Sequence, residues 1–91
     1  MISDKPTSEL IVMVCDEIKD LLLQKNAAYG DSALNPVRIF SKADPLEQIN
    51  VRLDDKLSRL ARGTASGEDT ELDLVGYLIL KRVAHLAQEK P

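Results

Sequence analysis

The sequence predicts an all-α protein, a small bundle of three long helices, on two observations. Apolar residues recur every three or four positions in three stretches, which is the period of amphipathic helices. Turn-forming residues separate these stretches, and the chain contains no alternating strand pattern and no repeat. We expect a polar leader over residues 1–7 and a single helical domain over residues 8–91.

The first expected helix is capped by Thr7 or Ser8 and runs to about Ala28. Its apolar stripe contains Leu10, Ile11, Val14, Ile18, Leu21, Leu22 and Ala28. Gly30 is suited to the left-handed turn that ends a helix. Cys15 lies within the apolar pattern and has no second cysteine to pair with, so we interpret it as a buried structural thiol.

The segment from residue 30 to residue 43 has no strong helical period. A stretch of this length between helices is typical of a loop that carries function. Asn35 and Pro36 favour one short additional helix in it, over residues 36–42.

The second expected helix has the clearest boundaries. Asp44 is placed as its N-cap, Pro45 as its first residue and Glu47 as the partner in a capping box, while Gly63 stops the helix. One face is formed by Leu46, Ile49, Leu53, Leu57 and Leu60. The opposite side has the spacing of surface ion pairs, with Arg52, Asp55 and Arg59.

The third expected helix begins at one of three caps, Ser66, Asp69 or Thr70. Its main apolar stripe is Leu72, Val75, Ile79, Val83 and Leu86. A second set, Leu74, Leu78 and Leu80, extends the apolar surface beyond one face. Because a helix this apolar needs more than one partner, the pattern predicts a central position or a homo-oligomer interface.

The overall charge excludes one class of partner. The formal net charge is −3, whereas proteins that bind the nucleic-acid backbone cluster Lys and Arg, so we expect no bulk nucleic-acid binding. No apolar run reaches the roughly 18 residues of a membrane span, and the first residues do not resemble a signal peptide. We therefore expect a cytoplasmic protein, with a single nucleotide still open as a ligand.

Three carboxylates in or beside apolar stripes are candidates for chemistry, namely Glu17, Asp54 and Asp73. Carboxylates from separate helices hold hard cations such as Mg²⁺, and such an ion carries a triphosphate and activates water. Each has a simpler interpretation, left open here. For Glu17 it is an ion pair with Lys25 or Lys56, for Asp54 it is solvation at the helix edge, and for Asp73 it is capping of the start of its own helix.

Basic residues at unusual positions add a candidate phosphate site. Lys25 lies on the apolar face of the first helix and Lys56 borders that of the second. Together with Arg38 they would hold phosphates, or else each lysine extends to water along the surface. His85 has no nearby ligand partner, so we interpret it as a surface residue.

Three blocks of the chain resemble a small phage and prophage family, the nucleotide-modification-associated domain 1 family. They are residues 25–32 with the pattern K-x-x-x-Y-G, residues 52–60 with D-K-x-x-R, and residues 68–77 with D-L-x-x-Y. The family is similar in outline to all-α MazG-like nucleoside-triphosphate pyrophosphohydrolases.

The resemblance implies Mg²⁺ held by helix carboxylates and hydrolysis of a nucleoside triphosphate to its monophosphate and pyrophosphate. It assigns metal binding to Asp54 or Asp55 and to Asp73, and it places Lys25, Tyr29 and Asp31 in the substrate loop. The acid pairs of those enzymes are incomplete here, because position 70 is Thr and position 51 is Val.

Three functions follow as hypotheses. The first is an Mg²⁺-dependent phage-type pyrophosphohydrolase in which Glu17, Asp54 and Asp73 hold the metal. The second is a non-catalytic protein that sequesters a nucleotide or nucleotide-derived signal, for example to counter a host defence. The third is an interaction module that docks a protein partner, such as a host protein, on the excess apolar surface of the third helix.

Overall fold

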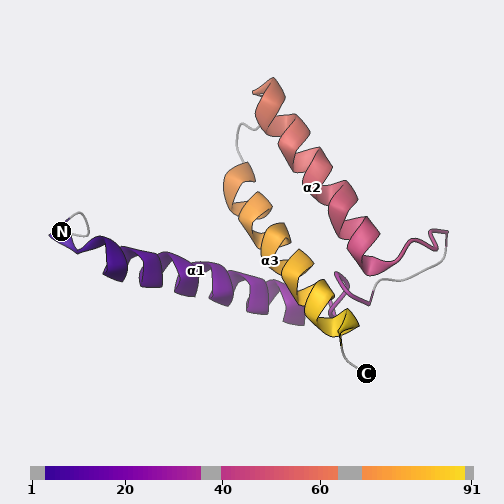
Figure 1. The fold of residues 1–91 in the computed structure, drawn as a ribbon, viewed down its shortest axis with the longest axis horizontal. Coiled ribbons are helices and arrows are strands. Elements are labelled where there is room, and N and C mark those ends of the chain that lie inside the picture. Colours follow the sequence, from indigo (N-terminus) through magenta and orange to yellow (C-terminus); the bar gives the residue numbers. More distant parts are fainter. Residues whose placement is uncertain (1–3, 36–39, 64–68, 90–91) are drawn as a thin grey trace. The chain divides into compact units, whose positions relative to one another are not determined.

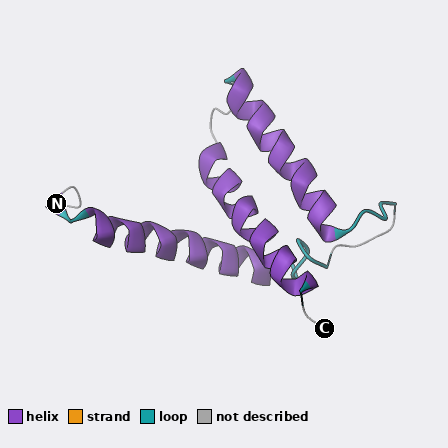
Figure 2. Ribbon diagram, viewed as in Figure 1, coloured by secondary structure: helices purple, strands orange, loops and turns teal. Residues whose placement is uncertain are grey.

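The computed structural model describes residues 4–35, 40–63 and 69–89. These residues form three helices and no strands, which confirms the all-α prediction: α1 (Thr7–Ala28), α2 (Pro45–Arg62) and α3 (Thr70–Gln88) (Figures 1 and 2). The chain divides into two compact units, Met1–Gly30 and Asp31–Pro91. No helix in the described part of the chain is long and apolar enough to cross a membrane.

The second unit is a hairpin of α2 and α3, and the ends of α2 follow the predicted signals. The Asp44 side chain accepts a hydrogen bond from the Glu47 amide at 2.8 Å, and Pro45 is the first helical residue. Gly63 ends the helix with a left-handed φ of 68°. The predicted surface ion pair forms between Arg59 Nε and Asp55 Oδ2 at 3.4 Å.

The hairpin core lies between α2 and α3. Ile49, Leu53 and Ala84 are buried, and Ile49 is 1% exposed. Four half-buried residues pack against them, Leu46, Leu74, Tyr77 and Leu80. Burial of such side chains is the main favourable contribution to the stability of this unit.

The structure shows which of the two apolar sets of α3 meets α2. Val75, Ile79, Val83 and Leu86 are exposed, whereas Leu74 and Leu80, predicted as additional surface, pack on the core. Both sets are apolar, and the choice between them is made by the fit to α2.

One residue of the predicted α2 face was wrong. Leu57 is exposed, while its neighbour Lys56 is half-buried. Toward the end of α2 the contact with α3 therefore moves from the Leu57 side of the stripe to the Lys56 side, as it does when two helices cross at an angle.

Asp69 is the N-cap of α3, one of the three predicted candidates, and its side chain accepts from the Leu72 amide at 3.0 Å. Thr70 is the first helical residue and does not serve as the cap. The third candidate, Ser66, lies outside the described residues.

The first unit consists of α1, which ends at Ala28 as predicted. Its start differs from the prediction, because Pro6 occupies the N-cap position without a side-chain cap and Thr7 is already helical. Cys15 is exposed, which corrects its interpretation as a buried thiol, and its apolar neighbours Ile11 and Val14 are exposed too.

The predicted short helix over residues 36–42 is not shown. Residues 36–39 lie outside the described residues, and residues 40–42 are not helical. The chain from residue 40 enters α2 through the Asp44 cap.

Candidate functional site

The D-K-x-x-R and D-L-x-x-Y segments meet in the hairpin through one ion pair. Lys56 Nζ of α2 lies 3.3 Å from Asp73 Oδ2 of α3. The two side chains retain only 14% and 29% of their exposure, so water screens the pair less than it does a surface pair. Two residues selected from the sequence as candidate ligands are thus direct partners.

Asp54 lies away from this ion pair. Its side chain is exposed, and positions two apart on a helix do not share a face, so Asp54 and Lys56 point to different sides of α2. Glu17 is exposed on α1, in the other unit. Across the described residues, no group of three or more His, Cys, Asp or Glu side chains could hold a metal ion.

Within the second unit, the predicted metal ligands Asp54 and Asp73 therefore do not lie together, and the assignment of Glu17, in the first unit, stays a prediction. Asp73 has Lys56 as a close partner, and a cation would have to compete with this ammonium for the carboxylate. Mg²⁺ binding remains a prediction from the resemblance, and the proposed function does not use it.

The end of α1 carries the first block of the resemblance. The amide of Tyr29 donates to the Lys25 carbonyl oxygen at 2.9 Å and closes the last turn. Both side chains are exposed, and Tyr29 retains 69% of its exposure. An exposed aromatic ring one turn from an ammonium group is a suitable pair of contacts for a nucleotide base and its phosphate.

Asp31 is engaged within its own loop. It has a left-handed φ of 60°, its carboxylate accepts from Asn35 Nδ2, and its carbonyl oxygen accepts from the Asn35 amide at 2.9 Å. These bonds give Asp31 a structural role in the turn that follows α1. Arg38, the remaining predicted phosphate ligand, lies outside the described residues.

Thr70, predicted as a candidate cap and as a departure from an acid pair, is instead a buried polar residue. Its side chain is 2% exposed, and its Oγ1 atom has no hydrogen-bond partner in the described structure. It lies three positions before Asp73, on the same side of α3. An unpaired buried hydroxyl costs free energy of folding, and no signal in the sequence pointed to it.

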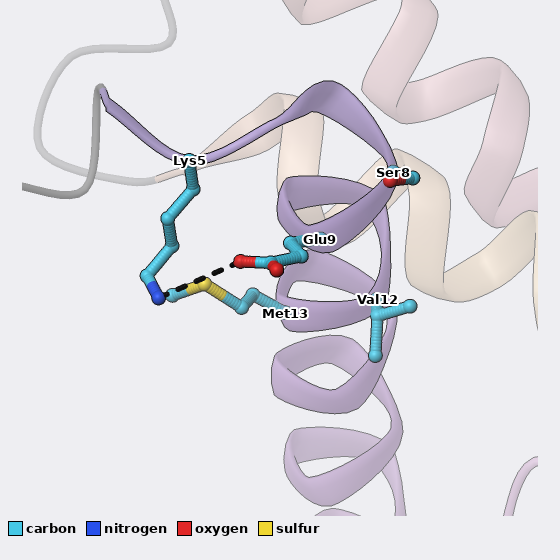
Figure 3. A pocket seen from close by; sticks show the side chains of 5 residues that line it. All are labelled: Lys5, Ser8, Glu9, Val12 and Met13. Carbon is cyan, nitrogen blue, oxygen red and sulfur yellow. Dashed lines mark ion pairs between the residues drawn. The ribbon is translucent and has the colours of Figure 1, made fainter.

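A surface hollow lies beside the first turns of α1, and no predicted site residue lines it. It is lined by Lys5, Ser8, Glu9, Val12 and Met13, and Lys5 pairs with Glu9 at 3.7 Å (Figure 3). All five residues come from one short segment, and the two charged ones pair with each other. His85 is exposed, as predicted.

Comparison of the chain with protein-family models, with curated proteins and with solved structures finds no match. The resemblance to the phage family therefore remains a prediction that depends on the three sequence blocks.

Proposed function

We propose that this chain handles nucleotides by binding them, and that it sequesters a nucleotide or nucleotide-derived signal. The observation that carries the proposal is the ion pair of Lys56 and Asp73, which joins two of the three sequence blocks in space. The proposal assigns a phosphate contact to Lys56 in the second unit. In the first unit, and as a separate assignment, Lys25 is proposed as a phosphate contact and Tyr29 as a ring for base stacking.

Lys56 is suited to a phosphate because its position is already fixed. Asp73 holds the ammonium group at a half-buried place on the hairpin, so less conformational freedom is lost when a ligand arrives. An ammonium group has three donors, so it serves one carboxylate and a phosphate oxygen together. In this arrangement Asp73 positions Lys56, whereas in a hydrolase it would hold the metal.

The first test is thermal unfolding against a panel of nucleoside mono-, di- and triphosphates, each with and without Mg²⁺. A ligand at about 100 times its Kd stabilises the folded state by roughly 2.7 kcal/mol. For a small domain this raises Tm by about 10 °C or more. We expect a rise that does not require Mg²⁺.

Two substitutions at the ion pair separate the binding function from hydrolysis. Lys56→Met should abolish the rise in Tm, whereas Asp73→Asn should reduce it without abolishing it, because the ammonium group remains but is no longer held in place. The charge-matched control is Lys19→Met, since Lys19 forms only an exposed pair with Asp16 at 3.4 Å. Pyrophosphate release that needs Mg²⁺ and disappears in Asp73→Asn would replace the binding proposal with the hydrolase.

Tyr29 supplies an independent test at the end of α1. Tyr29→Ala should weaken binding by about 1–3 kcal/mol, the typical contribution of one base stacked on an aromatic ring. Tyr29→Phe keeps the ring and should bind like the natural chain. Equal loss in both variants would assign the contribution to the hydroxyl group and contradict stacking.

A further inference from the structure

Helix α3 has two apolar faces on opposite sides. The face toward α2 includes Leu74, Tyr77 and Ala84. We define the outer face as Leu72, Val75, Ile79, Val83 and Leu86. At 3.6 residues per turn these five lie within about 40° of Ile79, while Tyr77 lies on the far side of the helix.

The outer face is open to solvent over most of its length. Val75, Ile79, Val83 and Leu86 are 39%, 40%, 41% and 46% exposed. A continuous apolar stripe of this kind on a short helix marks an interaction surface.

The spacing of the outer face is symmetric about Ile79. Its residues follow one another at intervals of three, four, four and three positions. An antiparallel second copy of α3 with a two-fold axis at Ile79 would therefore place Ile79 against Ile79, Val75 against Val83 and Leu72 against Leu86. A surface that is complementary to itself in this way is what a two-fold dimer requires.

The charges on α3 favour the same antiparallel direction. One flank of the outer face has Glu71 in the first turn of α3 and Arg82 in its second half. An antiparallel copy brings the acidic end of one helix to the basic end of the other, whereas a parallel copy would bring like charges together. The opposed helix dipoles add to this preference.

We propose that the outer face of α3 is a homodimer interface, in which two copies of α3 pack antiparallel about a two-fold axis at Ile79. This inference concerns assembly and is independent of the proposed nucleotide site, because none of the residues assigned to ligand binding lies on the outer face. Its tests use no nucleotide, so either proposal can fail alone.

Cysteine cross-linking tests the axis directly. In a Cys15→Ser background, Ile79→Cys should form a disulfide-linked dimer on oxidation, because only a residue at the axis meets its own copy. Val83→Cys alone should cross-link poorly, since it faces Val75, and the double variant Val75→Cys/Val83→Cys should restore cross-linking. Leu57→Cys, exposed on α2, is the control expected to remain monomeric.

Two cross-linking outcomes would overturn the inference. One is an Ile79→Cys chain that stays monomeric on oxidation, and the other is Val83→Cys cross-linking as readily as Ile79→Cys. Neither outcome depends on a variant that risks unfolding, because cysteine is close to the replaced residues in size and polarity.

Sedimentation measures the strength of the interface. The natural chain should dimerise at tens of micromolar, and Ile79→Lys should raise the dimer Kd at least about tenfold. Leu57→Lys introduces the same charge at an exposed α2 residue and should leave the Kd unchanged. A natural chain that is monomeric throughout, or a dimer indifferent to Ile79→Lys with normal helix content, contradicts the proposed interface.

Discussion

The two units of this chain form helices of similar length by different means. Helix α1 has 22 residues, α2 has 18 and α3 has 19. Both hairpin helices have side-chain caps and share a buried core, whereas α1 lacks a side-chain cap, and Ile18 is its one buried residue. The hairpin is thus stabilised by the packing of α2 against α3, whereas the contacts within the first unit are those of a single helix.

The largest expected effect comes from the centre of the hairpin core. Ile49→Ala should destabilise α2 and α3 by about 2–5 kcal/mol, because it removes buried surface and leaves a cavity. Amide hydrogen exchange should then show faster exchange throughout α2 and α3 and unchanged exchange in α1. Faster exchange in α1 as well would mean that the two units unfold together, which would break the comparison.

The matched substitution in the first unit is Ile11→Ala. Ile11 is exposed, so the change should alter stability by no more than about 0.5 kcal/mol. A loss in α1 comparable to that of Ile49→Ala would show that α1 has a packed face after all.

Helix capping gives the second-largest effect. Asp44→Ala removes the acceptor for the Glu47 amide and should lower the stability of the hairpin by about 1 kcal/mol, measured by urea unfolding. Pro6→Asp supplies α1 with the cap that it lacks and should raise the helix content by circular dichroism. No gain from Pro6→Asp would mean that the start of α1 is already stabilised by other contacts.

The unpaired hydroxyl of Thr70 predicts a gain. Thr70→Val is isosteric and removes a buried polar group, so it should stabilise the hairpin by up to about 1 kcal/mol. Thr70→Ser keeps the hydroxyl and loses a methyl group, so it should destabilise by about 0.8 kcal/mol. A loss of stability in Thr70→Val would show that the hydroxyl makes a bond in solution.

The smallest expected effects on stability come from exposed ion pairs, for which the two units should not differ. Asp55→Asn breaks an exposed pair on α2 and Asp16→Asn breaks one on α1. Each should cost about 0.2–0.5 kcal/mol, since exposed pairs within one helix contribute little in any context. Thermal unfolding at low and high salt checks this. The difference in Tm between each variant and the natural chain should disappear as the salt concentration rises.

Much of the fold could be predicted from local signals. The Asp44–Pro45 start and the Gly63 end of α2 follow from capping geometry, which depends on a few adjacent residues. Which face of α3 meets α2 could not be predicted in this way, because both faces are apolar and periodicity does not show which one fits the neighbouring helix.

In the candidate site, too, local signals could be predicted from the sequence and tertiary contacts could not. Lys56 and Asp73 were each selected from their place beside an apolar stripe, but their pairing depends on the crossing of two helices. Cys15 was misjudged because an apolar neighbourhood in sequence does not imply one in space. The unpaired Thr70 hydroxyl, a property of the folded hairpin, has no local sequence signature.

The Gly63 turn has a consequence for chirality. Its φ of 68° is favourable for a mirror-image amino acid, and the Cβ atom of an L-residue built there would meet nothing within 4 Å, so the backbone angle alone disfavours an L-residue. A D-alanine at this position would match the backbone and reduce the freedom of the unfolded chain, whereas L-alanine would be strained. The left-handed turn that ends α2 therefore discriminates between residues by their chirality. A chemically synthesised chain with D-alanine at position 63 should fold at least as stably as the natural one.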